Sequence, residues 1–317
     1  MNILCLASGS GGHVYPMLEL IKRSPNNIQI HYLCFQDGFE NELVKKAQIS
    51  YEILPLSMKK KKWKKKEWKF LFSQGKKYKN YDAILAGGGI ASFVGLCFSF
   101  SLRKPLYLCE QNAVMGDANR LAYPFCKAIF TYIPLQKKKE KNWGNPREDA
   151  FSSRKFTQGI LFFAGSLGSS SLREKLRPIL MKIKQKYPIT VVSKTPLEGI
   201  PTIPSLPHME ESLPTYRLLL MRAGATSISE SIRAQVPALL FPSPFVKHDH
   251  QRKNAKWYEK EVGIPSFEEA HLKEETLCHW VEELYENTKK REEVQDKLAK
   301  LGHQECAKKI WEEILKR

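Results

Sequence analysis

The feature that most constrains the fold of this chain is an alternation of short apolar runs with longer amphipathic stretches, repeated in each half. In the first half the expected strands are residues 3–7, 28–35, 83–86, 106–109 and 128–131, and the expected helices are 15–23, 40–47 and 91–102. In the second half the expected strands are 159–164, 189–193, 217–221 and 238–241, and the expected helices are 172–187 and 227–235. This alternation is typical of βαβ units on a parallel sheet. The sequence therefore predicts an α/β protein with two Rossmann-like domains and ligands bound between them.

The length and the hydrophobic content of the chain fit two domains. Its 317 residues suffice for two domains of ordinary size, and a hydrophobic content of 42% excludes global disorder. The alternation breaks at residues 134–154, which we interpret as a linker. Beyond Glu268 the chain is expected to be helical and charged to its end.

Positive charge is concentrated in one segment. The net charge is +18, and residues 59–79 contain eleven lysines and one glutamate. A basic surface of this kind predicts an anionic partner, which is nucleic acid, a phosphorylated substrate or a membrane. The segment also holds Trp63, Trp68, Phe70 and Phe72, which a merely solvated helix does not need. Lysines around aromatic side chains favour peripheral docking on an anionic membrane, and RNA binding is the rival interpretation.

Several classes of protein are disfavoured. The seven cysteines are scattered and form no C-x-x-C pair, which argues against a disulfide framework or a structural zinc site and for a reducing compartment. The first residues do not resemble a signal peptide, and the longest apolar run, 93–102, is too short to span a bilayer. We therefore expect a cytoplasmic protein whose membrane contact is peripheral.

Each half opens with a strand, a Gly/Ser loop and a helix. The two loops are Ser8-Gly9-Ser10-Gly11-Gly12-His13 and Gly165-Ser166-Leu167-Gly168-Ser169. Glycine lets the backbone approach a ligand, and the N-terminus of the following helix offers N–H groups to phosphate. The first loop lacks the third glycine of the dinucleotide-binding fingerprint, and the chain has no G-x-x-x-x-G-K-[ST] sequence. A dehydrogenase and an ATPase are thus disfavoured.

Four further stretches are polar where a plain α/β core does not need them. They are Cys109–Asn112 with Gly116 and Asn119, Asn145-Pro146-Arg147, Arg222–Glu230, and His248–Ala255. The first, third and fourth follow expected strands, at the sheet edge where such folds bind ligands. A helix that opens with Gly224-Ala225-Thr226-Ser227 has donors for phosphate, and Glu230 can accept both hydroxyls of a ribose. Gln251 and Asn254 share a helix face and suit sugar hydroxyls.

The order and spacing of these motifs resemble the MurG family, the UDP-N-acetylglucosamine (UDP-GlcNAc) transferase that converts lipid I to lipid II in peptidoglycan synthesis. The family's G-G-T-G-G-H-x-x-P is similar to Ser8–Pro16, and its H-E-Q-N-x-x-x-G-x-x-N is similar to Cys109–Asn119. Its N-P-V-R, G-G-S-Q-G-A, R-S-G-A-x-T-x-S-E and H-Q-x-x-N-A resemble 145–147, 164–169, 222–230 and 250–255. The match runs from residue 1 to about residue 260.

The resemblance implies a GT-B fold, with two Rossmann-like domains that face each other across a cleft. The acceptor and membrane-docking domain would be residues 1–146 together with a C-terminal helix in 303–317, and the donor domain would be 147–302. The implied donor-binding residues are Ser10, Gly11, Asn112, Arg147, Ser166, Met209, Ala225, Ser227, Glu230 and Gln251. The implied acceptor-binding residues are Gly12, His13, Gly89, Ser92 and Asn119. No cofactor or metal is implied, because loop amides, a helix dipole and Arg147 can take up the charge that grows on UDP.

The implied chemistry is displacement at the anomeric carbon with inversion, which needs a base for the acceptor's C4 hydroxyl. His13 has a suitable intrinsic pKa and is one candidate, although it can instead bind acceptor phosphate. Glu110 is the competing base, and Asp117 is a weaker one. The implied location is the cytoplasmic face of the bacterial inner membrane, with UDP-GlcNAc, lipid I and the anionic membrane as partners and no nucleic acid.

The chain departs from the family pattern at several positions. Ile90 and Phe93 stand where the family has Tyr and Gly, Cys109 stands in place of His, and Leu167 in place of Gln. Two alternatives therefore stay open. One is a related GT-B enzyme that glycosylates another lipid, such as diacylglycerol, and the other is a non-catalytic protein that binds nucleotide sugars or RNA. The pair His248-x-His250 lacks an upstream third ligand and is interpreted as part of the sugar loop rather than a metal site.

Overall fold

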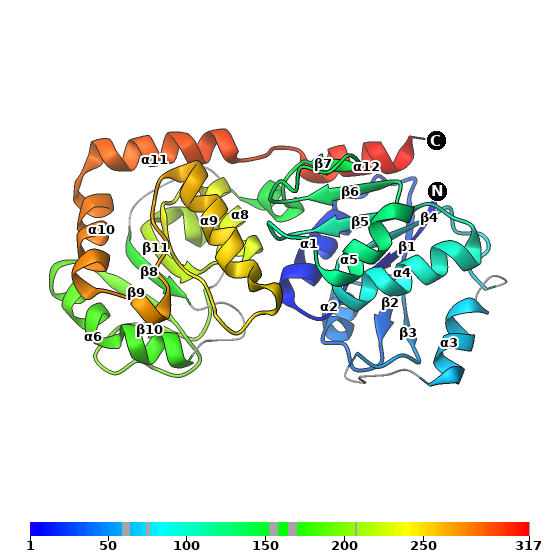
Figure 1. Ribbon diagram of the computed structural model, residues 1–317, viewed down its shortest axis with the longest axis horizontal. Helices are drawn as coiled ribbons and strands as arrows, with labels where there is room; N and C mark the ends of the chain where they lie inside the picture. Colours follow the sequence, from blue (N-terminus) through cyan, green and yellow to red (C-terminus); the bar gives the residue numbers. More distant parts are fainter. Residues whose placement is uncertain (59–63, 74–76, 152–157, 164–169, 207, 317) are drawn as a thin grey trace. The chain divides into compact units, whose positions relative to one another are not determined.

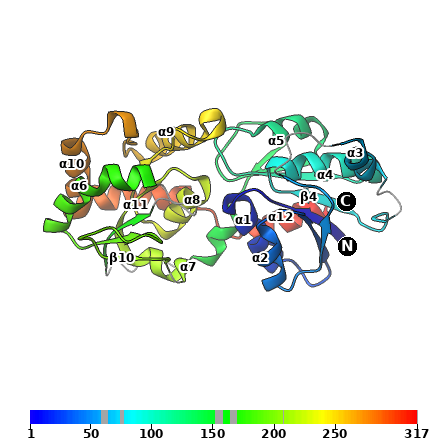
Figure 2. The same cartoon turned by 90° about the horizontal axis from the view of Figure 1, so that it is seen from below.

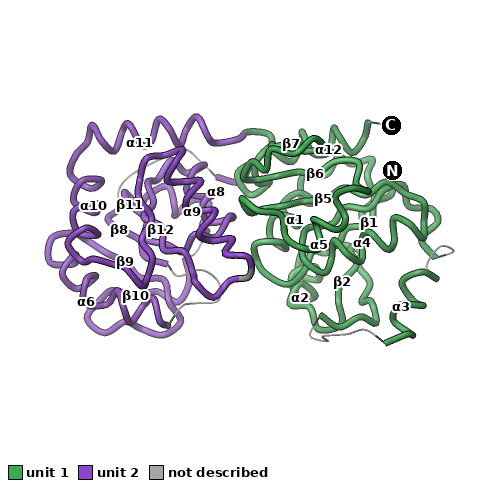
Figure 3. The backbone as a smooth tube through the Cα atoms, viewed as in Figure 1, with its two compact units in different colours: residues 1–149, 304–317 green, residues 150–303 purple. Residues whose placement is uncertain are grey.

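The computed structural model describes residues 1–58, 64–73, 77–151, 158–163, 170–206 and 208–316 (Figure 1). The chain divides into two compact units, which are coloured separately in Figure 3. Unit 1 comprises Met1–Asp149 and Gln304–Arg317, and unit 2 comprises Ala150–His303. The chain thus passes from unit 1 to unit 2 near residue 149 and returns near residue 304.

The described part of unit 1 contains one parallel sheet of seven strands in the order β3-β2-β1-β4-β5-β6-β7. The strands are β1 (Asn2–Leu6), β2 (Gln29–Phe35), β3 (Tyr51–Leu54), β4 (Ala83–Ala86), β5 (Leu106–Glu110), β6 (Ala128–Thr131) and β7 (Glu140–Asn142). Strands β2 and β3 lie on one side of β1, and β4 to β7 lie on its other side. The strand order therefore reverses at β1 and β4, the place where doubly wound sheets bind ligands at the carboxyl ends of their strands.

Helices cover both faces of this sheet. The helices are α1 (Gly11–Lys22), α2 (Glu40–Lys46), α3 (Lys65–Phe72), α4 (Gly89–Leu102), α5 (Asp117–Ala122) and α12 (Cys306–Leu315), with the 3₁₀ turns η1 (Tyr123–Phe125) and η2 (Pro146–Ala150). Figure 2 shows α3, α4 and α5 on one face and α1, α2 and α12 on the other. Two separate groups of buried apolar side chains match this arrangement, one for each face. Within the described residues, none of the helices combines the length and the apolar character needed to cross a bilayer.

The C-terminal helix α12 belongs to the core of unit 1. Trp311 is 1% exposed, and its Nε1–H donates to the carbonyl oxygen of Leu20 at 2.8 Å. The carboxylate of Asp149 accepts hydrogen bonds from the backbone N–H groups of Cys306 and Ala307, at 3.0 and 2.9 Å. Asp149 therefore satisfies two of the N–H groups that the first turn of a helix leaves unpaired. This contact joins the residue at which the chain leaves unit 1 to the helix with which it returns.

The described part of unit 2 contains a second parallel sheet, of five strands in the order β10-β9-β8-β11-β12. The strands are β8 (Gln158–Phe163), β9 (Ile189–Val192), β10 (Thr202–Ile203), β11 (Tyr216–Arg222) and β12 (Ala238–Phe241). The helices are α6 (Ser170–Lys186), α7 (Met209–Ser212), α8 (Ala225–Ala234), α9 (His250–Val262), α10 (Glu274–Glu286) and α11 (Thr288–Leu301), with the 3₁₀ turns η3 (Leu213–Thr215), η4 (Lys247–Asp249) and η5 (Glu269–His271). Two Rossmann-like domains with parallel sheets confirm the predicted fold class.

The predicted linker at 134–154 is wrong in part. It contains β7, which pairs in parallel with β6, and the turn η2. The side chain of Glu140 fastens β7, because it accepts hydrogen bonds from the Thr131 hydroxyl and from the backbone N–H groups of Leu135 and Lys137. The sequence Glu-Lys-Asn carries no apolar alternation, so its pairing at the sheet edge depends on the backbone and on this carboxylate. The short strands β3 and β10 escaped prediction as well.

Candidate active site

Three loops of unit 1 meet at the carboxyl ends of β1, β4 and β5. These strands are neighbours in the sheet, so the loops that follow them lie side by side. The loop after β1 leads into α1, and His13 lies in the first turn of that helix, where its N–H donates to the carbonyl oxygen of Ser10 at 3.0 Å. Helix α1 already begins at Gly11, earlier than the predicted residue 15, so Gly11 and Gly12 are helical.

Gly88, in the loop after β4, makes room for His13. Its φ is +81°, and a Cβ at this position would lie 2.5 Å from Cε1 and 2.6 Å from Nδ1 of His13. The same Cβ would lie 3.4 Å from Oε1 of Gln111, in the loop after β5. The backbone N–H of Gly88 donates to the hydroxyl of Ser92 at 3.0 Å. Gly88 therefore brings together residues from all three loops.

Glu110 organises the loop after β5. Within the described residues, its two carboxylate oxygens accept five N–H hydrogen bonds of 2.9–3.2 Å. The donors are the backbones of Gln111, Asn112 and Gly116 and the side-chain amides of Asn112 and Asn119. The side chain is 2% exposed. The spacing E-x-N-x-x-x-G-x-x-N thus has a local physical meaning, because these residues close a hydrogen-bonded cage around one carboxylate.

Two predicted acceptor contacts occupy buried structural positions instead. Ser92 is 0% exposed and receives the N–H of Gly88, and Asn119 is 1% exposed and donates to Glu110 and to the carbonyl oxygen of Cys109. Neither side chain presents a surface that a sugar can touch. Gly89 differs, because the space beside its Cα is open. Cys109 is also buried, and burial followed by the nearby Glu110 carboxylate raises the pKa of its thiol to about 12. It therefore stays neutral near pH 7.

Arg147 lies in a closed turn at the end of unit 1. Its backbone N–H donates to Oδ1 of Asn145 at 3.0 Å, and the backbone N–H of Asn145 donates to the carboxylate of Glu148 at 2.9 Å. Asn145 is fully buried and Arg147 is half-buried. The N-P-R motif thus forms a hydrogen-bonded turn that includes the backbone N–H of Arg147.

In unit 2, the loop after β11 leads directly into α8. Gly224 is the N-cap residue, and α8 begins with Ala225, Thr226 and Ser227. The backbone N–H groups of these three residues therefore lie at a helix N-terminus. Glu230 follows on the same helix and is 5% exposed. Asn254 is fully buried and donates to the carbonyl oxygen of Ala223 at 3.1 Å, so it supports this loop rather than facing a sugar. Ser166 and its loop lie outside the described residues.

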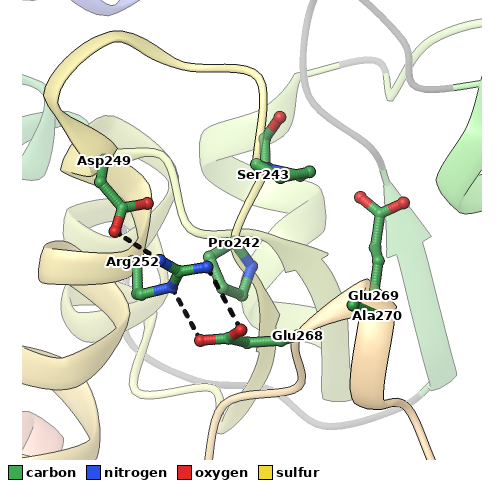
Figure 4. Close-up of a pocket in the computed structure, with 8 residues that line it drawn as sticks. Pro242, Ser243, Asp249, Arg252, Glu268, Glu269 and Ala270 are labelled. Carbon is green, nitrogen blue, oxygen red and sulfur yellow. Dashed lines mark hydrogen bonds and ion pairs between the residues drawn. The ribbon is translucent and has the colours of Figure 1, made fainter.

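Gln251, the second residue of α9, supports the loop after β12, because its Oε1 accepts the backbone N–H of Ser243 at 2.8 Å. A pocket of about 60 Å³ lies beside this loop. Its lining residues are Pro242, Ser243, Pro244, Asp249, Arg252, Glu268, Glu269 and Ala270. Figure 4 shows the Arg252 guanidinium held between Asp249 and Glu268, while the side chain of Glu269 extends away from this group. Met209 lies at the start of α7 and is partly buried against the core of unit 2.

Sequence reasoning missed the contribution of Glu269. Its Oε1 lies 2.5 Å from Nη1 of Arg222, and the two side chains are 11% and 7% exposed. Arg222 ends β11 and was found as part of a motif, but Glu269 belongs to the turn η5 and to no motif. Only their proximity in the folded unit reveals the pair.

An exposed aromatic patch lies on unit 1, formed by Trp68, Phe72, Phe100 and Phe125, which are 40–56% exposed. Two contacts connect its parts. The hydroxyl of Ser101 donates to the carbonyl oxygen of Phe72 at 3.2 Å, and the rings of Phe100 and Phe125 pack edge to face with centroids 5.0 Å apart. Phe70, by contrast, is half-buried against the core, and Trp63 lies outside the described residues. Phe100 and Phe125 were not predicted, because they are far from the basic run in sequence.

The chain is similar to known proteins in sequence. A model of the glycosyltransferase family 28 N-terminal domain matches residues 3–131, and one of the family 28 C-terminal domain matches residues 159–310. A protein of Pediococcus pentosaceus is 26% identical over 98% of this chain and 98% of its own length. A protein of Lactobacillus acidophilus is 29% identical over 80% of this chain and 83% of its own length. Both carry the name UDP-N-acetylglucosamine--N-acetylmuramyl-(pentapeptide) pyrophosphoryl-undecaprenol N-acetylglucosamine transferase.

A solved structure extends the likeness to the fold. The crystal structure of MurG from Acinetobacter baumannii has a TM-score of 0.79 to this chain, with 23% sequence identity, and the match covers 100% of this chain and 99% of that one. Both family 28 domains are present in order, and together the two matches span most of the chain. The predicted resemblance to MurG is thereby confirmed, and the protein belongs to glycosyltransferase family 28.

Proposed function

We propose that this protein moves GlcNAc from UDP-GlcNAc to the C4 hydroxyl of the N-acetylmuramic acid of lipid I, with inversion, and so forms lipid II. The observation that carries the proposal is the cluster of His13, Gly88, Gln111 and the Glu110 cage at the switch point of unit 1, within a chain that has both family 28 domains. The names of the relatives from Pediococcus and Lactobacillus support the same donor and acceptor.

In this proposal unit 2 binds the donor. The N-terminus of α8, near Ala225 and Ser227, and the loop that contains Ser166 would receive the diphosphate, and Glu230 the ribose. Within unit 2, Met209 and Gln251 would complete the site. Helix N-termini can offset the negative charge that develops on UDP, so the transfer needs no metal ion of its own.

The acceptor would bind to the loops of unit 1, near Ser10, Gly11, Gly12 and Gly89. His13 is a better candidate for the base than Glu110. Five N–H donors occupy the Glu110 oxygens and burial removes them from solvent, so they are poorly placed to receive a proton from a sugar hydroxyl. The Glu110 carboxylate would act as a positioning residue for the loop after β5, and His13 would touch the reacting hydroxyl.

We also propose that unit 1 docks peripherally on the cytoplasmic face of the membrane through the aromatic patch. Exposed lysines flank the patch on α3, at Lys65, Lys66 and Lys69. Aromatic rings at the headgroup level with lysines near anionic lipids form a typical interfacial arrangement. Each engaged lysine would contribute about 1 kcal/mol.

A single assay tests the reaction. Purified protein would be incubated with UDP-GlcNAc and a lipid I analogue, without added metal, and the product analysed by mass spectrometry. A product heavier by one N-acetylhexosamine is expected. Binding of UDP-GlcNAc without this product would contradict the acceptor assignment and favour another lipid, for which diacylglycerol is the first to try. Absence of both binding and product would favour a non-catalytic protein.

A further inference from the structure

A largely buried carboxylate in unit 2, that of Glu269, connects elements next to the proposed donor loops. Glu269 lies in η5 and pairs with Arg222 at 2.5 Å. Arg222 is the last residue of β11, directly before the loop that opens α8. Its Nη1 also donates to the carbonyl oxygen of Phe241, the last residue of β12, at 3.3 Å. The guanidinium thus ties together the carboxyl ends of two neighbouring strands.

The same glutamate also holds the first turns of α6. Its Oε2 accepts a hydrogen bond from the hydroxyl of Ser171 at 3.4 Å, and its carbonyl oxygen accepts one from the ammonium group of Lys175. Helix α6 begins at Ser170, immediately after the Gly/Ser segment 165–169 in the sequence. Through Arg222 and Ser171, Glu269 therefore connects the N-terminal regions of α6 and α8, the two helices that follow the candidate phosphate loops.

The energetics of such an ion pair indicate that it positions neighbouring elements rather than stabilises the fold. A buried ion pair loses much of its attraction to the desolvation of both charges, and well-packed apolar residues often serve stability as well. A carboxylate near a diphosphate site would also repel the ligand unless a cation neutralised it. Here Arg222 neutralises Glu269, so the helix N-termini remain the groups that attract phosphate.

We infer that Glu269 is a positioning residue for the nucleoside diphosphate of the donor, because its pair with Arg222 and its bond to Ser171 fix the N-terminal regions of α8 and α6 relative to each other. This inference rests on the proposed donor site in unit 2. Glu269 itself does not touch the donor. Its effect is transmitted through Arg222 and Ser171.

The test compares Glu269→Gln with a matched control, Glu268→Gln. Each variant removes one negative charge, and the two residues are neighbours in the sequence. Glu268, however, pairs with Arg252 in a half-exposed group, and the Glu269 side chain points away from this group in Figure 4. The Kd of UDP-GlcNAc would be measured by titration calorimetry, together with KM, kcat and the melting temperature. We expect Glu269→Gln to raise Kd and the donor KM about tenfold, equivalent to ~1.4 kcal/mol, with kcat at saturating donor nearly unchanged. Glu268→Gln should leave the Kd close to that of the wild type.

Other outcomes would overturn the inference. A lower melting temperature with wild-type Kd would mean that the pair is only structural. A lower Kd in Glu269→Gln would mean that the carboxylate merely repels the diphosphate. If the wild type itself does not bind UDP-GlcNAc, the proposed function fails and this inference fails with it. If the wild type and Glu269→Gln bind UDP-GlcNAc equally well, only this inference is contradicted.

A second variant covers the case in which Glu269→Gln is unstable. Replacing Arg222 and Glu269 together by Leu removes both charges and leaves no unpaired ion in the interior, a change that often preserves stability. The double variant should fold and should also show a raised Kd for UDP-GlcNAc. Wild-type affinity in the folded double variant would overturn the inference.

Discussion

The imidazole of His13 occupies the space into which any side chain at Gly88 would project, since a Cβ there would lie 2.5 Å from the ring. The left-handed φ of +81° at Gly88 is a second reason for glycine. His13 and Gly88 come from loops after different strands, so the position of the proposed base depends on a residue that carries no functional group.

Gly88→Ala is therefore expected to displace His13 and to reduce kcat by about tenfold or more, as expected when a reacting group is misplaced by about 1 Å. The Kd of UDP-GlcNAc should stay unchanged, because the proposed donor residues near α8 belong to unit 2 and are far from Gly88 in the sequence. Steady-state kinetics and calorimetry would check this. Gly263→Ala is the matched control, since its φ is +83°, it lies outside the proposed sites, and the added Cβ would meet only the flexible end of the Lys297 side chain. An equal loss in both variants would point to backbone strain rather than to the collision.

His13 and Glu230 should have separable effects. We expect His13→Ala to lower kcat by about 10²–10⁴-fold, the usual contribution of general base catalysis, and to leave UDP-GlcNAc binding intact. Glu230→Ala should instead weaken UDP-GlcNAc binding, because it removes the proposed acceptor for the ribose hydroxyls. Titration calorimetry and turnover assays on both variants would show the split. Full activity in both would refute the assignment of these sites.

Glu110→Gln distinguishes a positioning role from a catalytic one. The amide group of glutamine would bring N–H donors against the five donors that now face the carboxylate, so part of the cage would be lost. Buried donors left without a partner cost about 1–3 kcal/mol each. We expect a lower melting temperature together with reduced activity. If kcat disappears while the melting temperature is unchanged, Glu110 is the base after all.

The aromatic patch should govern binding to membranes. Replacing Phe72 and Phe100 by Ser removes two apolar side chains, each worth about 1.5–3 kcal/mol when fully buried, so partition into vesicles should fall by at least about tenfold. The measurement is co-sedimentation with vesicles that contain phosphatidylglycerol. Higher salt should weaken the lysine contribution but not the aromatic one. A matched control is Phe245→Ser, at an exposed residue of unit 2. Equal binding by the wild type and the double variant would exclude this surface.

Helix α12 should be essential to the stability of unit 1. Trp311→Ala removes a buried side chain and its hydrogen bond to Leu20, and such changes cost about 3–5 kcal/mol. Urea unfolding would measure the loss. Trp311→Phe keeps most of the apolar volume and should cost less. If Trp311→Ala unfolds at the wild-type urea concentration, α12 is only loosely attached to the unit.

The fold class could be predicted because its signals are local. Apolar runs that alternate with amphipathic stretches specify strands and helices within a few residues of each other, and glycines mark the turns between them. The segments that prediction missed, β3, β7 and β10, are short strands at the sheet edges, where pairing depends on the neighbouring strand rather than on the segment's own pattern. Residues 140–142 are an example, since Glu140 acts through contacts with Thr131 and Leu135.

The sequence by itself determined which residues are candidates for the site, because His13, Glu110, Glu230 and Gln251 stand in ordered motifs. Only the tertiary structure decided how each candidate is surrounded. It buried Ser92, Asn119 and Asn254 as supports, enclosed Glu110 in donors and brought Glu269 to Arg222. The physical reason is that burial and hydrogen-bond saturation depend on neighbours supplied by other strands and helices. A motif can identify a polar residue, but the fold determines whether its side chain faces solvent or the interior.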